Sequence, residues 1–268
     1  MIHFFRKIRR TFLSENRISK YFIYAIGEII LVMAGIMLAL YFDNLNTKKE
    51  NNIKEEWYLI NIVEDIEYQK DDLKDLKEDC EKGILIGKKI LKDFYALQGF
   101  SKIDSLNERI NSLMFANNFP NINNTYQELV SSGQQSLIEN KDLSIDIIDY
   151  YLFCEDNYID FINNNNNIFY KEVFKTMFNS TQISLSELDL ESEEKGLLIY
   201  DENINLFLKN ELKKPSEALK LLNAIKLKIL ILDNHLAMVD ETLTAGKDLV
   251  KKIDSYLGLT TGMVNNYD

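Results

Sequence analysis

The sequence predicts an all-α protein in which one N-terminal transmembrane helix precedes an elongated antiparallel helical bundle. The 268 residues include only two prolines and ten glycines, which is too few for a turn-rich β fold. Two long segments also repeat apolar residues at alternating spacings of three and four, which is the periodicity of an amphipathic α-helix. A basic leader and an apolar span stand before both segments.

The N-terminal region has the composition of a membrane anchor. Residues 1–20 contain one acid, Glu15, and six basic side chains that are candidate topology determinants: Arg6, Lys7, Arg9, Arg10, Arg17 and Lys20. Residues 21–42 then contain a single ionisable side chain, Glu28. As a helix this span would cover about 33 Å, enough for a hydrocarbon core of about 30 Å.

A cleavable signal peptide is the alternative interpretation of this region. The apolar run of residues 21–42 exceeds the usual apolar region of about 7–15 residues, and no small-x-small cleavage site follows it. An uncleaved signal anchor is therefore favoured. Six basic residues precede the span and three follow it within eighteen residues, so the N-terminus is expected in the cytoplasm. In a bacterium, the protein would sit in the inner membrane with its main domain in the periplasm.

Glu28 is unusual because a carboxyl group within a membrane span is costly and usually faces protein or water. At 100° per residue, Gly35 and Ala39 lie within about 20° of Glu28 on the helix surface. Gly35-x-x-x-Ala39 is a small-x-x-x-small pattern, which permits close approach of a second helix. We interpret this face as an interface for self-association or for a partner helix. A protonated or headgroup-seeking carboxyl and a proton or ion path are the alternatives.

The charge of the distal region restricts its partners. The chain has 31 basic and 42 acidic residues, and without the leader's six and one, residues 21–268 carry 25 and 41, a formal charge of −16. This balance argues against nucleic acid and against an anionic membrane surface as partners of the distal domain.

Two apolar stripes of equal length predict the two long helices of the bundle, residues 43–258. Pro215 in the first turn and Gly258 beyond the end bound the C-terminal helix, and residues 259–268 form a tail. Its stripe comprises Leu222, Ile225, Ile229, Leu232, Leu236, Val239, Leu243, Gly246, Val250, Ile253 and Leu257. The post-membrane stripe comprises Leu59, Ile62, Ile66, Gln69, Leu73, Leu76, Cys80, Gly83, Gly87, Ile90 and Phe94. Coiled-coil dimerisation through the second stripe is the alternative, but its polar and glycine interruptions favour packing within one chain.

Shorter elements lie between these helices. The capping-box pattern Thr125 to Glu128 opens a short helix, and Gly133 is a candidate C-cap. A third long helix is expected over 141–178, with a kink at the asparagine run 163–167, since asparagine is a modest helix former. Its apolar stripe comprises Ile145, Ile148, Leu152, Ile159 and Ile162. Helices over 104–117 and 203–213 and a polar loop over 180–196 complete the bundle.

No catalytic or cofactor motif is present in the sequence, and we expect neither an enzyme nor a metal site. The acidic run of residues 187–194 lacks the glycine turn of a calcium loop and is interpreted as solvated. His235 borders the C-terminal stripe, where a structural or exposed role is expected. Cys80 and Cys154 form either a disulfide or two buried thiols. The aromatic stripe of Tyr150, Tyr151, Tyr158 and Phe161 indicates core packing, with a ligand pocket between helices as the alternative.

Two passages of the sequence contain distinctive motifs. The first runs from Phe4 through Arg10 and continues with the span motifs Tyr24-Ala-Ile-Gly-Glu28-Ile and Gly35-Ile-Met-Leu-Ala39-Leu. The second is Thr125-Tyr-Gln-Glu-Leu-Val-Ser-Ser-Gly133, followed by Ser136 to Lys141. Together these passages resemble an uncharacterised family of single-pass membrane proteins common in Bacteroidetes. The resemblance implies an inner-membrane anchor with an extracytoplasmic helical domain and no activity that can be transferred. It marks Glu28 and the Thr125, Glu128 and Gly133 turn as characteristic.

The sequence therefore favours a membrane-anchored protein without enzymatic activity. Its expected partners are the lipid bilayer and a protein, or a second copy, that contacts the membrane helix; the function would be protein binding or a structural role in a cell-envelope complex. An extracytoplasmic sensor that binds a small ligand between helices and signals through a partner is the second hypothesis. No cofactor is expected.

Overall fold

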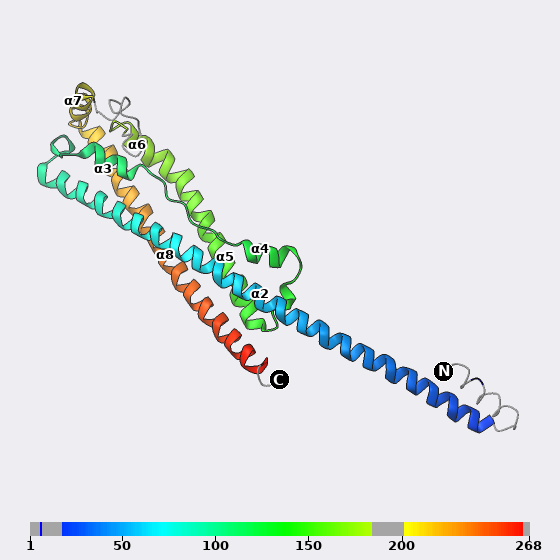
Figure 1. The fold of residues 1–268 in the computed structure, drawn as a ribbon. Helices are drawn as coiled ribbons and strands as arrows, with labels where there is room; N and C mark the ends of the chain where they lie inside the picture. Colours follow the sequence, from blue (N-terminus) through cyan, green and yellow to red (C-terminus); the bar gives the residue numbers. More distant parts are fainter. Residues whose placement is uncertain (1–5, 7–17, 184–200, 265–268) are drawn as a thin grey trace, which may run out of the picture. The chain divides into compact units, whose positions relative to one another are not determined.

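The computed structural model describes residues 6, 18–183 and 201–264, and within these ranges every regular element is a helix (Figure 1). The all-helical prediction is thus confirmed. By its contacts the chain divides into two units, Met1–Trp57 and Tyr58–Asp268. The elements are α2 (Ile18–Leu97), η1 (Phe100–Lys102), α3 (Leu106–Leu113), α4 (Asn124–Ser131), η2 (Gln135–Leu137), α5 (Lys141–Asn163), η3 (Asn164–Phe174), α6 (Lys175–Phe178), α7 (Glu202–Glu211) and α8 (Pro215–Val264).

The first unit contains the N-terminal part of α2, which is long and apolar enough to cross a membrane. Its most apolar window of 18 residues has a mean hydropathy of 2.2, and none of that window is buried in the structure. Large side chains such as Leu31, Met37 and Phe42 are exposed. An α-helix satisfies its own backbone hydrogen bonds, so such a segment needs only an apolar surrounding.

In the second unit, α2 packs against α8 through the two glycines that interrupt its stripe. A Cβ atom on Gly83 would lie 2.6 Å from Leu232 Cδ1, and one on Gly87 would lie 2.7 Å from Ile229 Cγ1. Both glycines therefore receive side chains of α8. The α2 stripe is confirmed: its members from Leu59 to Ile90 are all buried.

The α8 stripe is correct in part. Ile225, Leu232, Val239 and Ile253 are buried as expected, but the apolar residues that alternate with them, Ile229, Leu236, Leu243 and Val250, are only half-buried. The row one residue earlier is fully buried and comprises Lys228, His235, Thr242 and Leu249. The buried face is wider than a heptad seam because α8 contacts α5, η3 and α6 as well as α2.

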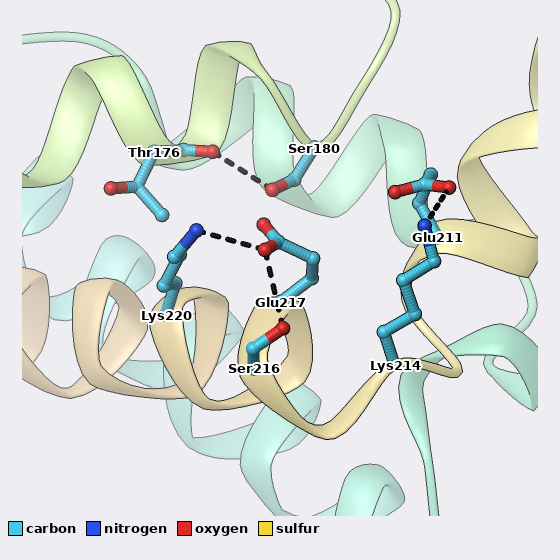
Figure 2. Close-up of polar contacts among 7 residues, drawn as sticks. All are labelled: Thr176, Ser180, Glu211, Lys214, Ser216, Glu217 and Lys220. Carbon is cyan, nitrogen blue, oxygen red and sulfur yellow. Dashed lines mark hydrogen bonds and ion pairs between the residues drawn. The ribbon is translucent and has the colours of Figure 1, made fainter.

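The sequence predicts the start of α8 correctly but not its end. Pro215 is its first residue, where the fixed φ of proline favours a helix start. Gly258 lies inside the helix, which continues to Val264, so the first six residues of the segment 259–268 are helical instead of forming a tail. Just before and after Pro215, ion pairs join Lys214 to Glu211 at 2.6 Å and Lys220 to Glu217 at 2.8 Å (Figure 2).

The third long helix is present, but the aliphatic stripe expected on it is largely exposed, and most of its aromatic stripe lies in the core instead. Ile145 and Leu152 are 55% and 56% exposed, whereas the buried residues are Leu143, Ile147, Tyr150, Tyr151, Cys154, Asn157 and Phe161. Tyrosine and phenylalanine bury more surface than isoleucine, so the aromatic face of the helix packs into the core and the aliphatic face remains outside it.

The α-helical turns of α5 end at Asn163, where the sequence predicts a kink. The next eleven residues, Asn164–Phe174, form π-helical turns before α6 resumes the α form. Asn165, Phe169 and Val173 are buried on this segment. Wider π turns are rare and are found frequently at functional sites.

The buried side chains form two hydrophobic clusters. One joins α2 from Tyr58 to Ile84 with α4, α5 and the part of α8 from Leu232 to Ile253. The other joins Ile90 and Phe100 with α3, η3, α6 and the N-terminal half of α8. Along α8, Ile231 belongs to the second cluster and Leu232 to the first, and Ile229 packs against both, so the clusters meet between Lys228 and His235.

We predict that Gly87→Leu lowers the free energy of unfolding by about 1–3 kcal/mol, because the added side chain would displace Ile229 from the space that it fills beside Gly87. Gly258→Leu is the matched control, since a Cβ atom there meets nothing within 4 Å. Thermal unfolding of the full chain in detergent, followed by circular dichroism, measures both. Equal melting temperatures for the two variants would contradict the close α2–α8 contact.

Candidate functional site

The membrane-helix face predicted from the sequence is uncovered in the structure. Glu28, Gly35 and Ala39 are all exposed on α2, and a Cβ atom on Gly35 would meet nothing within 4 Å. No contact within the described residues therefore demands a glycine at this position. Among the basic residues of the leader, Arg6 is exposed. Lys20 lies within α2, and Lys7, Arg9, Arg10 and Arg17 lie outside the described residues, as does the acidic run 187–194.

The Thr125–Gly133 turn is a helix held by α2 instead of by its own capping box. Thr125 is the second residue of α4, and its backbone N–H donates to Asp65 Oδ2 of α2 at 2.9 Å. Glu128 accepts a hydrogen bond from Tyr58 Oη at 3.5 Å. The capping-box prediction is therefore wrong, because a carboxylate from another helix satisfies the helix start.

The C-cap prediction for Gly133 is confirmed. Its φ is +69°, its N–H donates to Val130 O at 3.1 Å, and the N–H of Gln134 donates to Leu129 O at 3.1 Å. This pair of bonds defines a Schellman motif, in which glycine adopts the left-handed conformation without steric cost.

Both cysteines are free, buried thiols, so the disulfide alternative is not realised. Cys154 Sγ lies 3.7 Å from Gln69 Nε2, and Cys80 Sγ accepts from Asn117 Nδ2 at 3.2 Å. Burial raises the pKa of both thiols, that of Cys154 to about 11. A thiol with a raised pKa is a poor nucleophile at neutral pH, so the pair serves packing.

Gln69 interrupts the α2 stripe because it joins three parts of the second unit. Tyr150 Oη of α5 donates to Gln69 Oε1 at 2.6 Å, and Gln69 Nε2 donates to the carbonyl oxygen of Pro120 at 2.7 Å. The aromatic stripe of α5 is divided: Tyr150, Tyr151 and Phe161 are buried, whereas Tyr158 is 36% exposed. Core packing is thus the outcome for three of its four members.

Lys228 on α8 is buried, which the sequence did not predict; His235, for which a structural or exposed role was expected, is buried as well. Lys228 is 3% exposed, its Nζ donates to the carbonyl oxygen of Phe115 at 2.8 Å, and it lies 4.2 Å from the centre of the Phe169 ring. Burial lowers the pKa of this amine to about 8. The amine is thus stabilised by a carbonyl dipole and a π face, and no ion pair to a carboxylate forms within the described residues.

His235, two turns further along α8, is 1% exposed and stacks on Phe161 with ring centres 3.7 Å apart. Neither ring nitrogen has a hydrogen-bond partner within the described part of the chain. Burial and the positive charge of Lys228 lower the pKa of this imidazole to about 4, so it is neutral at pH 7. A heptad count on Lys228, His235 and Thr242 would have found this row, but polar residue types hide it from a search for apolar ones.

A cavity of 410 Å³ opens between α2, α5 and α8. Its apolar lining comes from Ile66, Leu73, Tyr150, Leu243 and Val250, with Thr242 and Gly246 on α8. Four charged residues also line it, namely Glu67, Lys70, Lys74 and Lys247. Small-molecule sites have volumes of about 300–1,000 Å³ and mainly apolar walls, and this cavity meets both criteria.

Two further cavities are less suited to a ligand. One of 170 Å³ lies between the start of α3 and α7 and is below the usual size of such sites. The other, of 570 Å³, lies between α5 and the C-terminal part of α8 and is lined by acidic and basic residues. There Lys252 pairs with Asp146 at 2.7 Å, so the polar walls satisfy one another.

The described residues contain no group of three or more histidine, cysteine or acidic side chains that could hold a metal ion. In comparisons with protein-family models, with curated proteins and with solved structures, nothing matches this chain. The uncovered face of the apolar part of α2 and the cavity are therefore the two features that bear on function.

We predict that Lys228 makes stability rise with pH. The pKa of the Lys228 amine is about 8 in the folded protein, against an ordinary value of 10.5 in the unfolded chain. The unfolded chain therefore binds more protons than the folded protein between these two pH values. Burial of Lys228 lowers the free energy of unfolding by its full amount, about 3 kcal/mol, below pH 8. This loss decreases as the pH rises towards 10.5. Lys228→Met should lose this rise, and the exposed Lys226→Met should keep it. Unfolding in detergent between pH 7 and 9.5 tests this, and identical pH profiles for both variants would contradict it.

Proposed function

We propose that this is a single-pass membrane protein without enzymatic activity that binds another membrane-spanning helix through Glu28, Gly35 and Ala39. It would serve as a structural or accessory subunit of a cell-envelope complex. The observation that carries this proposal is the uncovered face of α2: Gly35 has open space around it, and the apolar window is entirely exposed. In lipid, small residues permit helices to approach closely enough for van der Waals contact and interhelical hydrogen bonds.

Glu28 gives this face its specificity. A carboxyl group within hydrocarbon is more stable where a neighbouring helix or water can hydrogen-bond to it. Because Glu28 lies within about 20° of Gly35 and Ala39 on the helix surface, a helix that packs on the small residues also meets the carboxyl group. Helix pairing therefore accounts for all three residues, whereas an ion path accounts for Glu28 alone.

For residues 43–258 we propose an antiparallel bundle on the extracytoplasmic side. Pairs of contacting residues support this direction of packing: Lys77 pairs with Asp240 at 2.6 Å, Gly83 receives Leu232, and Gly87 receives Ile229. Residues later in α2 thus contact residues earlier in α8, as expected for antiparallel helices. The leader, the span and the passage 125–141 support membership of the Bacteroidetes family that they resemble.

A second candidate function is ligand sensing by the bundle, and the 410 Å³ cavity favours it. A sensor of this kind would signal through the partner that binds the membrane helix. The two candidates are therefore compatible, since one concerns the span and the other the bundle.

We predict that Gly35→Leu weakens helix association by about 1–2 kcal/mol, or about five- to thirtyfold, because a leucine side chain prevents close approach. Glu28→Gln should alter association as well, since it removes the ionisable group from the same face. Crosslinking in native membranes, with pull-down in mild detergent, measures the associated species and separates a homodimer from a complex with another protein.

Gly27→Leu is the matched control for this experiment. Gly27 also has nothing within 4 Å, but it lies about 100° from Glu28 around the helix. Unchanged association in both Gly35→Leu and Glu28→Gln would refute the interface, and equal loss in Gly27→Leu would show that the effect is not specific to this face.

We predict that a reporter fused to the N-terminus is located in the cytoplasm and one fused to the C-terminus on the other side of the membrane. The reason is the excess of basic residues before the span. Replacing Arg6, Arg9, Arg10 and Arg17 by glutamine should increase the inverted fraction, which the same reporters measure. An N-terminal reporter outside the cytoplasm in the unmodified protein would overturn the proposed topology.

A further inference from the structure

The floor of the 410 Å³ cavity is apolar because its polar groups are already satisfied. Tyr150 Oη is directed to Gln69 Oε1 at 2.6 Å. Thr242 Oγ1 accepts from Asn157 Nδ2 at 3.0 Å and donates to the carbonyl oxygen of Met238 at 2.7 Å. The cavity therefore presents the ring of Tyr150 with the side chains of Ile66 and Leu73, and this surface suits a hydrocarbon chain.

The rim of the cavity is basic, although the chain as a whole carries a net charge of −11. Lys70, Lys74 and Lys247 stand there against a single acid, Glu67. Lys70 pairs with Glu67, and Lys74 pairs with Asp71 at 2.8 Å. Lys247 is exposed and forms no ion pair within the ranges that the structure describes. The rim can therefore receive an anion at Lys247.

From this combination we infer that the cavity binds an amphiphile with one apolar chain and an anionic head group, its chain on the floor and its head at Lys247. This inference deepens the second candidate function, ligand sensing, and is independent of helix pairing. Long-chain carboxylates and single-chain phospholipids share this chemistry. A cationic amphiphile would meet the like charge of Lys247, and a fully polar ligand would leave the floor without matching groups.

The test uses the full chain in phosphatidylcholine nanodiscs and a sixteen-carbon carboxylate with a photoreactive group in its chain. After irradiation, peptide mass spectrometry should locate the label on the cavity-lining segments of α2 and α8, in addition to any lipid-like labelling of the span. Unlabelled palmitate and palmitoyl lysophosphatidylglycerol are the two competitors, and the stronger one identifies the source of the head group.

Lys247→Glu should lower labelling of the cavity segments by about three- to tenfold, because the loss of an exposed charge contact is worth about 1 kcal/mol. Val250→Trp should abolish it by filling the cavity from a half-buried position. Lys226→Glu is the control, with the same charge change on an exposed position of α8 outside the cavity. Circular dichroism verifies that each variant retains its helix content and melting temperature, and if Val250→Trp fails to fold, Leu243→Phe replaces it.

Labelling confined to the span in the unmodified protein would overturn the inference. So would equal labelling by the methyl ester of the same probe, since the ester lacks the charge that Lys247 is proposed to recognise. Association of the membrane helix, measured with the Gly35→Leu and Gly27→Leu pair, is read separately. Ligand binding in the cavity can thus be refuted while the helix interface is supported, and the reverse.

Discussion

The close approach of α2 and α8 at Gly83 and Gly87 is the contact on which the rest of the second unit depends. With no side chain on either glycine, Leu232 and Ile229 enter the space beside the α2 backbone, and the two longest helices share one line of contact. α5, η3 and α6 then pack against α8. Helix packing of this kind is fixed by the size of the contact residues, which explains why glycines can interrupt an apolar stripe without weakening it.

Placing Lys228 and His235 in the core has an energetic cost that apolar residues would avoid, since burial disfavours the charged form of each. Lys228 offsets part of it through the Phe115 carbonyl oxygen and the Phe169 ring, whereas His235 stacks on Phe161 without hydrogen bonds to the described residues. Both aromatic partners flank or belong to the π-helical segment. The wider turns of the π-helical segment therefore lie beside the part of α8 that contains Lys228 and His235, where the two hydrophobic clusters meet.

Much of this architecture follows from sequence, and the errors have identifiable causes. Periodicity predicted the long helices because a run of many turns leaves little ambiguity in period. It failed to choose the face of α5, where Ile145 and Leu152 form one apolar stripe and Tyr150 and Cys154 lie on another; only the neighbouring helices decide between them. The start of α4 was missed for a similar reason, because its capping carboxylate, Asp65, lies 60 residues earlier in the chain. The position of Glu28, Gly35 and Ala39 on one face of α2 follows from sequence, since it involves one helix only, but the cavity does not, since three helices form it.

The position of the cavity follows from the residues that border the α2–α8 contact. At Gly83 and Gly87 the facing residues are branched and apolar, and they fill the space between the helices. Towards Gly246 the α2 residues beside the contact are Lys70 and Lys74, whose ammonium groups pair with Glu67 and Asp71 at the surface. Their side chains therefore leave space between the helices unfilled. The apolar floor is then left accessible at the place where the rim is basic. A hydrophobic surface of this kind is stabilised when an apolar group covers it, and with Lys247 beside it the covering group is best supplied by an anionic amphiphile.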